Sequence, residues 1–299
     1  MILLTGSSGF IGKNLQKAFP DQFICLIREG SQDNSLCKQS KIIAYGDGMF
    51  EGVTSVIHLG GLAHSNHYTK TDYQEVNVDY TLDLARKAYF AGVKRFIFVS
   101  SIGVNGSNTT DKAFTPYSPV NPTTLYGKSK LEAEVKLKDL SRETGFGLVI
   151  VRPTLVYGPR APGNFGLLER AVRRFPLLPF KLVDNKRDFI SVFNLADLLI
   201  TCAKHPDADG HTFLASDGES ISIKDFTNAI ARGQNRTIIQ VPVPIFFMRF
   251  LGRLFVRENV VEQLIGNLQV ESSNLKKVLN WRAPYTINQA MSLLSGGGK

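Results

Sequence analysis

Short runs of β-branched and aromatic residues alternate with longer helical patterns over the first half of the chain. This alternation is typical of βαβ units and predicts a parallel sheet with helices on its faces. The runs that we expect to form strands are Ile2–Leu4, Phe23–Ile27, Ile42–Tyr45, Val53–Leu59, Arg95–Val99 and Leu148–Val151. Apolar residues at helical spacing predict two long helices, over Asp72–Ala91, which Gly92 ends, and over Leu125–Glu143.

The pattern changes after Pro153, where turn-rich segments precede scattered helices and weaker strand patterns. We therefore predict an α/β fold with two lobes, a Rossmann-like, doubly wound parallel sheet and a smaller mixed α/β lobe. The expected ranges are 1–153 for the first lobe, with 187–205 returning to it, 154–186 and 206–295 for the second, and 296–299 for a tail.

Composition narrows the class of protein. Apolar residues make up 43% of the chain and charged residues 20%, which is typical of a globular protein and excludes fibrous or low-complexity sequences. The net charge of +9 favours anionic partners. Because no nucleic-acid-binding motif is present, we assign this surplus to phosphate-bearing ligands and to the surface, and we predict no nucleic-acid partner.

The cysteines and histidines predict neither disulfides nor a metal site. Cys25, Cys37 and Cys202 lie far apart without a Cys-x-x-Cys pair, which fits a reducing compartment. His64 and His67 lack a carboxylate at a metal-binding spacing, and His58 lies inside a predicted strand as a packed, hydrogen-bonded core residue. The apolar start of the chain is too short for a signal peptide, so we predict a cytoplasmic protein.

The segment Pro244–Arg257 predicts a helix with one stripe of arginines, at positions 249, 253 and 257, on an otherwise apolar surface. We expect this helix to pack on a core or on a second subunit, and we expect a homodimer. Contact with a membrane surface is the alternative, because basic amphipathic helices can lie in the lipid interface.

Glycines at the end of the first strand predict a dinucleotide site. Gly6, Gly9 and Gly12, with Phe10 and Ile11 between them, lie where the first strand turns into a helix. Such a loop allows a tight turn, brings backbone N–H groups close to a pyrophosphate and lets the helix approach the strand.

The end of the second strand bears on the choice between NAD and NADP. An arginine at this position accommodates the 2′-phosphate of NADP, whereas an acid accepts a hydrogen bond from the ribose hydroxyl of NAD. The strand ends in Arg28 and Glu29, so Arg28 favours NADP, and Glu29 would favour NAD if the strand ended later.

Tyr126 and Lys130 are one helical turn apart and lie on the same face of a predicted helix. A tyrosine with an ordinary pKa near 10 is a poor acid or base at neutral pH, so a nearby ammonium would have to lower that value. The pair alone is more often a surface pair. Ser100 and Ser101 supply the missing partner, because they end a buried strand at the edge of the sheet where α/β folds bind ligands.

Taken in order, these motifs resemble the extended short-chain dehydrogenase/reductases, in particular their nucleotide-sugar epimerases, dehydratases and 4-ketoreductases. The matching segments are Thr5–Gly12, His58–Ala63, Val76–Asp79, Ser100–Gly106, Tyr126–Lys130, Val151–Pro159 and Lys186–Ile190. The resemblance implies that Tyr126 is the acid/base, that Lys130 lowers its pKa and holds the nicotinamide ribose, and that Ser101 hydrogen-bonds the reacting oxygen. Ser100 is the fallback for Ser101.

The same resemblance implies the remaining contacts. Further cofactor-binding residues are expected at Asp47, Leu59, Gly60, Gly61, Asn77, Ser100 and Pro153. Asn164 and Arg187 match residues that hold the substrate's nucleotide diphosphate, although Arg187 could instead pair with Asp188, and we interpret Arg152 as structural. Gly60–Gly61 replaces the usual Ala-Ala beside the nicotinamide, and Asn105 replaces a tyrosine.

The resemblance also limits the reaction. Dehydratases carry an acidic pair directly after the strand-end hydroxyl, where this chain has Ile102–Gly103. The reaction that remains is hydride chemistry at C4 of a nucleotide-linked sugar, with UDP as the expected nucleotide. The resemblance implies that this sugar is used in surface polysaccharide synthesis. Arg28 turns our preference to a 4-ketoreductase that consumes NADPH, and a 4-epimerase is the alternative. A dinucleotide-sensing regulator or scaffold without catalysis is the alternative of another class.

Overall fold

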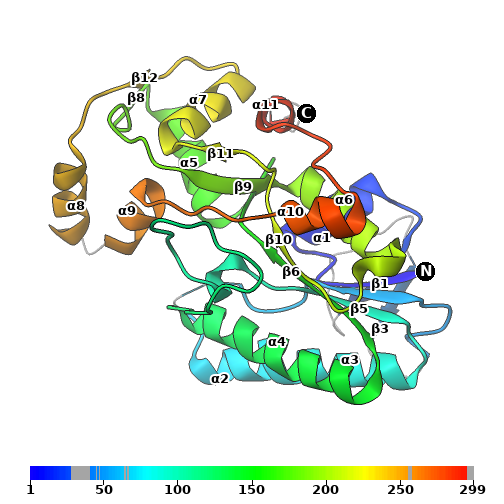
Figure 1. Ribbon diagram of the computed structural model, residues 1–299. Coiled ribbons are helices and arrows are strands. Elements are labelled where there is room, and N and C mark those ends of the chain that lie inside the picture. Colours follow the sequence, from blue (N-terminus) through cyan, green and yellow to red (C-terminus); the bar gives the residue numbers. More distant parts are fainter. Residues whose placement is uncertain are drawn as a thin grey trace.

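The computed structural model describes residues 1–27, 41–44, 46, 48–63, 65, 67–254 and 258–294. Seven parallel strands form the main sheet in the order β10-β6-β5-β4-β1-β2-β3 (Figure 1). They are β1 (Ile2–Thr5), β2 (Phe23–Ile27), β3 (Lys41–Ala44), β4 (Ser55–His58), β5 (Arg95–Val99), β6 (Gly147–Pro153) and β10 (Thr212–Ala215). The strand order reverses between β1 and β4, so the predicted doubly wound sheet is confirmed, and ligands bind at such a point in open α/β sheets.

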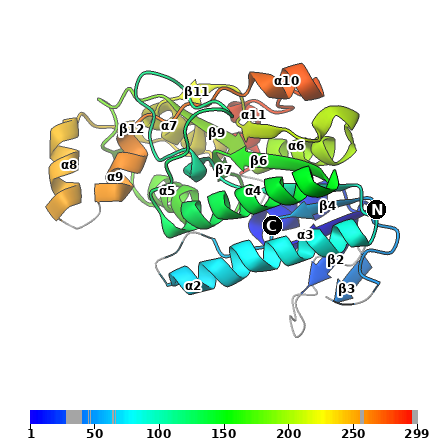
Figure 2. The same ribbon diagram turned by 60° about the horizontal axis from the view of Figure 1, so that its bottom comes forward.

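Helices cover both faces of this sheet (Figures 1 and 2). One layer consists of α2 (Lys70–Tyr73), α3 (Tyr80–Phe90) and α4 (Leu125–Thr144), and the opposite layer of α1 (Phe10–Ala18), α6 (Val192–Lys204) and α10 (Ser273–Leu279). A π-helical segment, Gln74–Asp79, joins α2 to α3, and 3₁₀ turns lie at Ile102–Val104 and Pro206–Ala208. None of the helices in the described part of the chain is long and apolar enough to span a bilayer.

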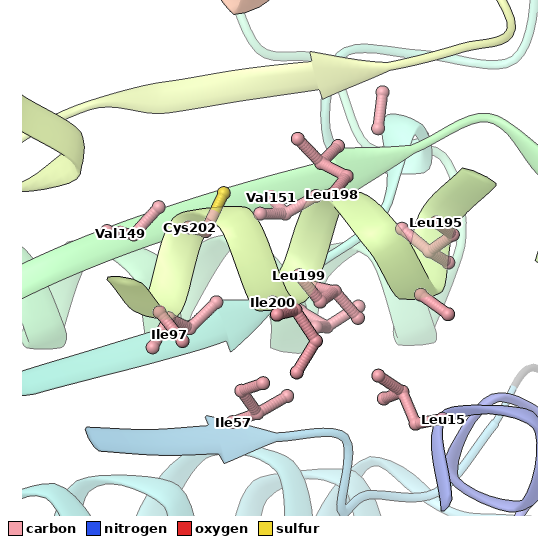
Figure 3. Close-up of a cluster of buried hydrophobic side chains, with 14 of the residues drawn as sticks. Leu15, Ile57, Ile97, Val149, Val151, Leu195, Leu198, Leu199, Ile200 and Cys202 are labelled. Carbon is pink, nitrogen blue, oxygen red and sulfur yellow. The ribbon is translucent and has the colours of Figure 1, made fainter. Parts of the chain in front are cut away.

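Strand β5 shows why the predicted strands are nearly continuous apolar runs. Phe96 and Phe98 belong to the hydrophobic cluster beneath α3 and α4, whereas Ile97 and Val99 belong to the cluster beneath α1 and α6. Side chains alternate between the faces of a strand, so a sheet that is covered on both faces buries every residue. Figure 3 shows the second cluster, in which Leu195, Leu198, Leu199 and Cys202 of α6 pack toward the strands.

The small lobe is built on two further sheets and a third hydrophobic cluster. Its strands are β7 (Leu155–Tyr157), β8 (Leu177–Leu178), β9 (Arg187–Ser191), β11 (Ser220–Ile221) and β12 (Ile239–Gln240), and its helices are α5 (Gly163–Arg174), α7 (Ile223–Gly233), α8 (Ile245–Leu254), α9 (Glu258–Ile265) and α11 (Ile287–Ser292). Strand β9 pairs parallel with β7 and antiparallel with β11, so the lobe is mixed, as predicted. The stacked rings of Phe189 and Phe226, 3.8 Å apart, lie in its core.

The structure divides the chain differently from the predicted boundaries. The segment 187–205 does return to the main sheet, but through α6, because its strand β9 belongs to the small lobe. Strand β10 and helix α10 also join the main sheet or its core, although both fall within the predicted small-lobe range 206–295. A short strand pattern does not specify its partner strand, so the sequence could not assign these segments.

Candidate active site

The glycine loop that connects β1 to α1 is closely packed against neighbouring main chain, and the side-chain amide of Gln16 donates to the Ser7 carbonyl at 2.8 Å. Gly6 adopts φ +66°, and its carbonyl accepts a hydrogen bond of 3.0 Å from the N–H of Gly9. A Cβ at Gly6 would lie 2.8 Å from the carbonyl carbon of Leu59 in the loop after β4. At Gly12 a Cβ would lie 2.7 Å from the Cα of Ser7 and overlap the Gly6 carbonyl. The two glycines therefore let the helix and the neighbouring loop approach the turn.

These features fit the pyrophosphate of a dinucleotide. Gly9 is the N-cap of α1, and no side chain caps the helix there. The first N–H groups of an α-helix have no partner within it and favour a bound anion. The backbone at Gly9, Phe10 and Ile11 would therefore hold the phosphates.

Three side chains of the α2–α3 helix hold the end of β4 and the loop that follows it. Thr81 hydrogen-bonds His58 at 2.9 Å, the Asn77 side-chain oxygen accepts from the N–H of Leu62 at 2.7 Å, and Tyr73 donates to the carbonyl of Ala63 at 3.1 Å. Gly60 and Gly61 lie within this loop, and a Cβ at Gly61 would be 2.8 Å from the Asn77 side-chain oxygen. Asn77 is thus a buried brace for the predicted nicotinamide-side loop.

His58 is a packed core residue, as predicted, but it also connects the two loops. Its Nδ1 shares a hydrogen bond of 2.8 Å with the hydroxyl of Thr5, which in turn accepts from the N–H of Gly60 at 3.0 Å. Burial, and then the positive charge of Lys130, lower the pKa of His58 to about 3. The imidazole is therefore neutral at physiological pH and holds the ends of β1 and β4 together.

The two serines at the end of β5 have different surroundings. The Ser101 hydroxyl accepts a hydrogen bond of 3.1 Å from the N–H of Gly103 and caps the 3₁₀ turn. The Ser100 hydroxyl is buried and has no hydrogen-bond partner among the described residues. An unpaired buried hydroxyl costs free energy. Ser100 therefore fits a ligand that supplies the missing partner, which agrees with its predicted place at the cofactor.

The start of α4 places Tyr126 beside the 3₁₀ turn that Ser101 caps. Thr124 caps the helix by accepting from the N–H of Gly127 at 3.0 Å. A Cβ at Gly127 would lie 2.9 Å from the carbonyl of Gly103. Only a residue without a side chain allows this close approach between α4 and the turn that follows Ser101.

Lys130 is buried deep in the same helix. Its ammonium donates to the carbonyl of Val99 at 3.0 Å and lies 4.6 Å from the centre of the Phe98 ring. Burial lowers the pKa of Lys130 to about 8, and the negative charge of Glu134 partly opposes this shift. The ammonium is therefore fixed at the carboxyl end of β5, close to both serines.

The pKa of Tyr126 is raised, not lowered. Burial and then the neighbouring phenol of Tyr73, whose ring centre is 6.4 Å away, raise the pKa of Tyr126 to about 12. The predicted lowering by Lys130 is therefore not the net effect of the protein, because desolvation disfavours the phenolate more strongly. At neutral pH Tyr126 carries its proton.

A buried ion pair between Glu134 and Arg152 joins α4 to β6. Arg152 donates to both carboxylate oxygens of Glu134, and to the side-chain oxygen of Asn105 at 2.9 Å. Its exposed fraction is 2%, which agrees with the structural role predicted for Arg152. Asn105, the departure from the family pattern, thus contacts protein groups through its oxygen.

The two predicted substrate residues lie in the small lobe. Asn164, at the start of α5, is exposed and donates to the side chain of Gln263 in α9 at 2.7 Å. Arg187 is buried and donates to the carbonyl of Gly266 at 2.8 Å, while Asp188 accepts from Ser220 and from the N–H of Val270 instead. Burial lowers the pKa of Arg187 to about 10, so it remains a cation. Binding of a diphosphate by these residues stays a prediction.

Three further residues that we predicted to bind the cofactor are Pro153, Arg28 and Asp47. Pro153 ends β6, where it is paired in register with Ala215 of β10. Arg28 and Asp47 lie outside the described residues, so the structure says nothing about either.

Sequence reasoning missed several residues that support the site. Ser129 accepts a hydrogen bond of 3.0 Å from Asn77 and donates to the carbonyl of Tyr126. Its position between Tyr126 and Lys130 was a usable signal, whereas the contacts of Thr5 and Thr81 with His58 join distant segments that no local pattern links.

Comparison with known proteins agrees with this arrangement. A model of the NAD dependent epimerase/dehydratase family matches residues 2–216. The chain is 38% identical to the UDP-glucose 4-epimerase of Vibrio cholerae over 304 aligned residues, which cover 96% of this chain and 92% of the relative. It is also 23% identical to the N-acetyl-alpha-D-glucosaminyl-diphospho-ditrans,octacis-undecaprenol 4-epimerase of Escherichia coli O157:H7, over 97% of this chain and 92% of that one.

Solved structures share the fold over almost the whole chain. The UDP-N-acetylglucosamine 4-epimerase from Bacillus cereus superposes with a TM-score of 0.78 at 18% identity, covering 98% of this chain and 97% of that one. The UDP-glucose 4-epimerase of Thermotoga maritima, solved with UDP-glucose, gives 0.76 at 19% identity and covers 99% and 97%.

The fold and the site together define an enzyme of the extended short-chain dehydrogenase/reductase type, which confirms the predicted resemblance. More particularly, the chain belongs to the NAD dependent epimerase/dehydratase family.

Proposed function

We propose that this enzyme is a 4-epimerase of a UDP-linked hexose or N-acetylhexosamine. The observation that carries the proposal is the 38% identity to a UDP-glucose 4-epimerase, which continues through both lobes over 96% of the chain. The lack of a carboxylate at Ile102–Gly103, after the strand-end serine, argues against a dehydratase.

The comparisons favour the epimerase, our alternative from the sequence, over the preferred 4-ketoreductase. That preference rested on Arg28 and the use of NADPH as a consumed reductant, and Arg28 lies outside the described residues. The named whole-length relatives are both 4-epimerases. A role in surface polysaccharide synthesis is part of the proposal, supported by the relative that acts on an undecaprenol-linked sugar.

The residues at the end of β5 and the start of α4 supply the proton chemistry. Tyr126 can take the proton of the C4 hydroxyl only as a phenolate, so the positive charges of Lys130 and of a bound nicotinamide would have to lower its pKa from about 12 for this step. Lys130 would stabilise the phenolate through its fixed positive charge, and Ser101 would hydrogen-bond the C4 oxygen. The loop at Gly9, Phe10 and Ile11 and the ammonium of Lys130 would hold the dinucleotide, which when bound would supply the reversible hydride chemistry at C4 that epimerisation requires.

The masses of the products and the balance of reduced nicotinamide distinguish an epimerase from a reductase. The purified protein is incubated without oxygen with UDP-glucose, UDP-galactose and their N-acetylated counterparts, and products are separated by chromatography and weighed. We expect interconversion of 4-epimers without a change in mass or in reduced nicotinamide. Stoichiometric NADPH oxidation with a UDP-linked 4-keto-6-deoxy sugar, and no epimerisation, would identify a reductase instead.

An epimerase returns its cofactor to the starting state, so it has no need to exchange it. We therefore propose that the enzyme retains NAD and that Glu29 accepts a hydrogen bond from its ribose hydroxyl. Denaturing the purified protein and identifying the released dinucleotide tests this proposal. Released NADP, together with loss of NADPH preference in Arg28→Ala, would restore the assignment based on Arg28.

A further inference from the structure

Helix α8 exposes apolar side chains on the face that is turned away from the core. Ile245 and Met248 pack against the hydrophobic cluster of the small lobe. Phe246, Phe250 and Leu254, spaced by four residues, have exposed fractions of 73%, 58% and 62%. Both ribbon views place α8 at an extremity of the molecule, away from the main sheet (Figures 1 and 2). The contacts of Ile245 and Met248 agree with the expectation that this helix packs on a core, and Phe246, Phe250 and Leu254 leave a second, exposed apolar face.

Exposed apolar residues continue beside the start of this helix. Strand β12 pairs with β8 so that Ile239 lies opposite Leu177, and their exposed fractions are 61% and 54%. The N–H of Lys181 donates to the carbonyl of Val241, which places the exposed Leu182 next to the segment that leads into α8. We call the exposed side chains of Leu177, Leu182, Ile239, Phe246, Phe247, Phe250 and Leu254 the distal surface.

The positive charge of the protein is concentrated in the same two segments. Residues 170–183 and 226–254 contain eight of the 35 lysines and arginines and none of the 26 acidic residues. The rest of the chain therefore has 27 basic and 26 acidic residues and is almost neutral, although the whole chain carries +9. The basic residues are Arg170, Arg173, Arg174, Lys181, Arg232, Arg236, Arg249 and Arg253.

We propose that the distal surface docks on the interface of a bilayer that contains anionic phospholipids. Exposed phenylalanine and leucine side chains on a helix insert at the boundary of headgroups and acyl chains, and surrounding arginines are attracted to anionic headgroups. This inference goes beyond the proposed epimerase activity and does not depend on it.

A second copy of the chain fits this surface poorly. In a symmetric dimer the same patch meets itself. The basic residues of the two segments would then face their counterparts in the other copy. Neither segment itself holds an acid, and Glu262 of α9 already pairs with Arg249. Such a juxtaposition of like charges is unfavourable.

Docking through α8 would bring the predicted substrate residues close to the lipid. Arg249 of α8 pairs with Glu262 of α9 at 2.7 Å, and the next residue, Gln263, accepts from Asn164. Asn164, one of the two predicted substrate residues, would thus lie near the headgroup layer.

Co-sedimentation with vesicles tests the proposal on the full chain. We expect binding to phosphatidylcholine vesicles that contain about 30% phosphatidylglycerol. We expect no binding to phosphatidylcholine alone, and release in about 1 M salt, where the Debye length is about 3 Å. Absence of binding to the anionic vesicles at low salt would overturn the proposal.

Two double variants separate the apolar and the charged contributions. Phe246→Ser with Phe250→Ser, and independently Arg173→Glu with Arg174→Glu, should each weaken binding about tenfold or more. Phe90→Ser is the matched control, because Phe90 is 82% exposed on α3 of the other lobe and should leave binding unchanged. Thermal unfolding checks that each variant is folded, and the arginine pair provides the test if the phenylalanine pair does not fold.

Two outcomes point to other partners. If light scattering shows a dimer that Phe246→Ser with Phe250→Ser dissociates, while vesicles do not bind, the surface joins two copies and the proposal fails. It also fails if the Phe90 control loses vesicle binding as strongly as the distal variants, because the binding would then not be specific to this surface.

Discussion

The two halves of the active site are built from different parts of the chain. The half at the end of β1 is made of backbone, where α1 begins without a side-chain cap and a Cβ at Gly6 or Gly12 would meet neighbouring main-chain atoms. The half at the end of β5 is made of side chains: Tyr126 and Lys130 lie on helix α4, and the buried hydroxyl of Ser100 has no hydrogen-bond partner among the described residues.

This difference determines how each half fails. In the backbone half, an added carbon atom meets atoms that cannot move without shifting the main chain. In the side-chain half, removal of one functional group leaves the packing in place and removes one chemical step. Substitutions in the two halves should therefore separate cofactor binding from catalysis.

Replacement of Tyr126 by phenylalanine should give the largest effect. We expect turnover to fall by about 10²–10⁴-fold, the usual contribution of a general acid or base, while dinucleotide affinity stays nearly unchanged. Steady-state rates and a binding titration measure the two quantities. Tyr117→Phe is the control, because Tyr117 is 91% exposed and should keep full activity. A Tyr126→Phe enzyme with more than half of the wild-type rate would refute the assignment.

The burial of the Lys130 ammonium should reduce the folding stability of the protein at pH values where Lys130 is charged. Its pKa is about 8 in the folded chain against 10.5 for the ordinary group, so between these values the unfolded chain binds more protons. Stability should then rise by up to about 3 kcal/mol as pH increases from about 8 to about 10.5. Denaturant unfolding of the wild type and of Lys130→Met over this range measures the difference. Equal pH dependence in the two proteins would contradict the lowered pKa.

Gly12→Ala should weaken dinucleotide binding by the loop between β1 and α1. The added Cβ would lie 2.7 Å from the Cα of Ser7, and such overpacking costs about 1–3 kcal/mol, so we expect dinucleotide affinity to fall by about tenfold. Gly46→Ala is the control, because a Cβ there meets nothing within 4 Å. Calorimetric titration checks both variants, and unchanged affinity in Gly12→Ala would mean that the loop relaxes without affecting the phosphate site.

Sequence patterns predicted the main sheet well because its strands are short, buried on both faces and separated by clear helices. The predicted bounds of β2 and β5 agree with the structure, and α4 begins at Leu125 as expected. The pairing of β9 and β10 was not predictable, because it depends on contacts between segments far apart in the chain.

The sequence predicted that Tyr126 and Lys130 share one helix, but it did not predict the raised pKa of Tyr126. The spacing of Tyr126 and Lys130 places both on α4. Desolvation of the phenol, however, depends on Tyr73 and on the packing of other elements, and no sequence spacing reports it. The brace of Asn77 on Ser129 likewise joins two helices that only the folded chain brings together.

The π-helical turn at Gln74–Asp79 sets the phase of the helix that holds the loop after β4. In an α-helix, every fourth residue drifts by about 40° around the axis, so Tyr73 and Thr81 would point about 80° apart. The wider π turn holds more residues and takes up part of this drift, which lets Thr81 reach His58 at the end of β4 while Tyr73 and Asn77 reach the loop that follows it. Deletion of one residue from this turn would rotate one end of the helix by about 100° relative to the other and would withdraw part of these contacts.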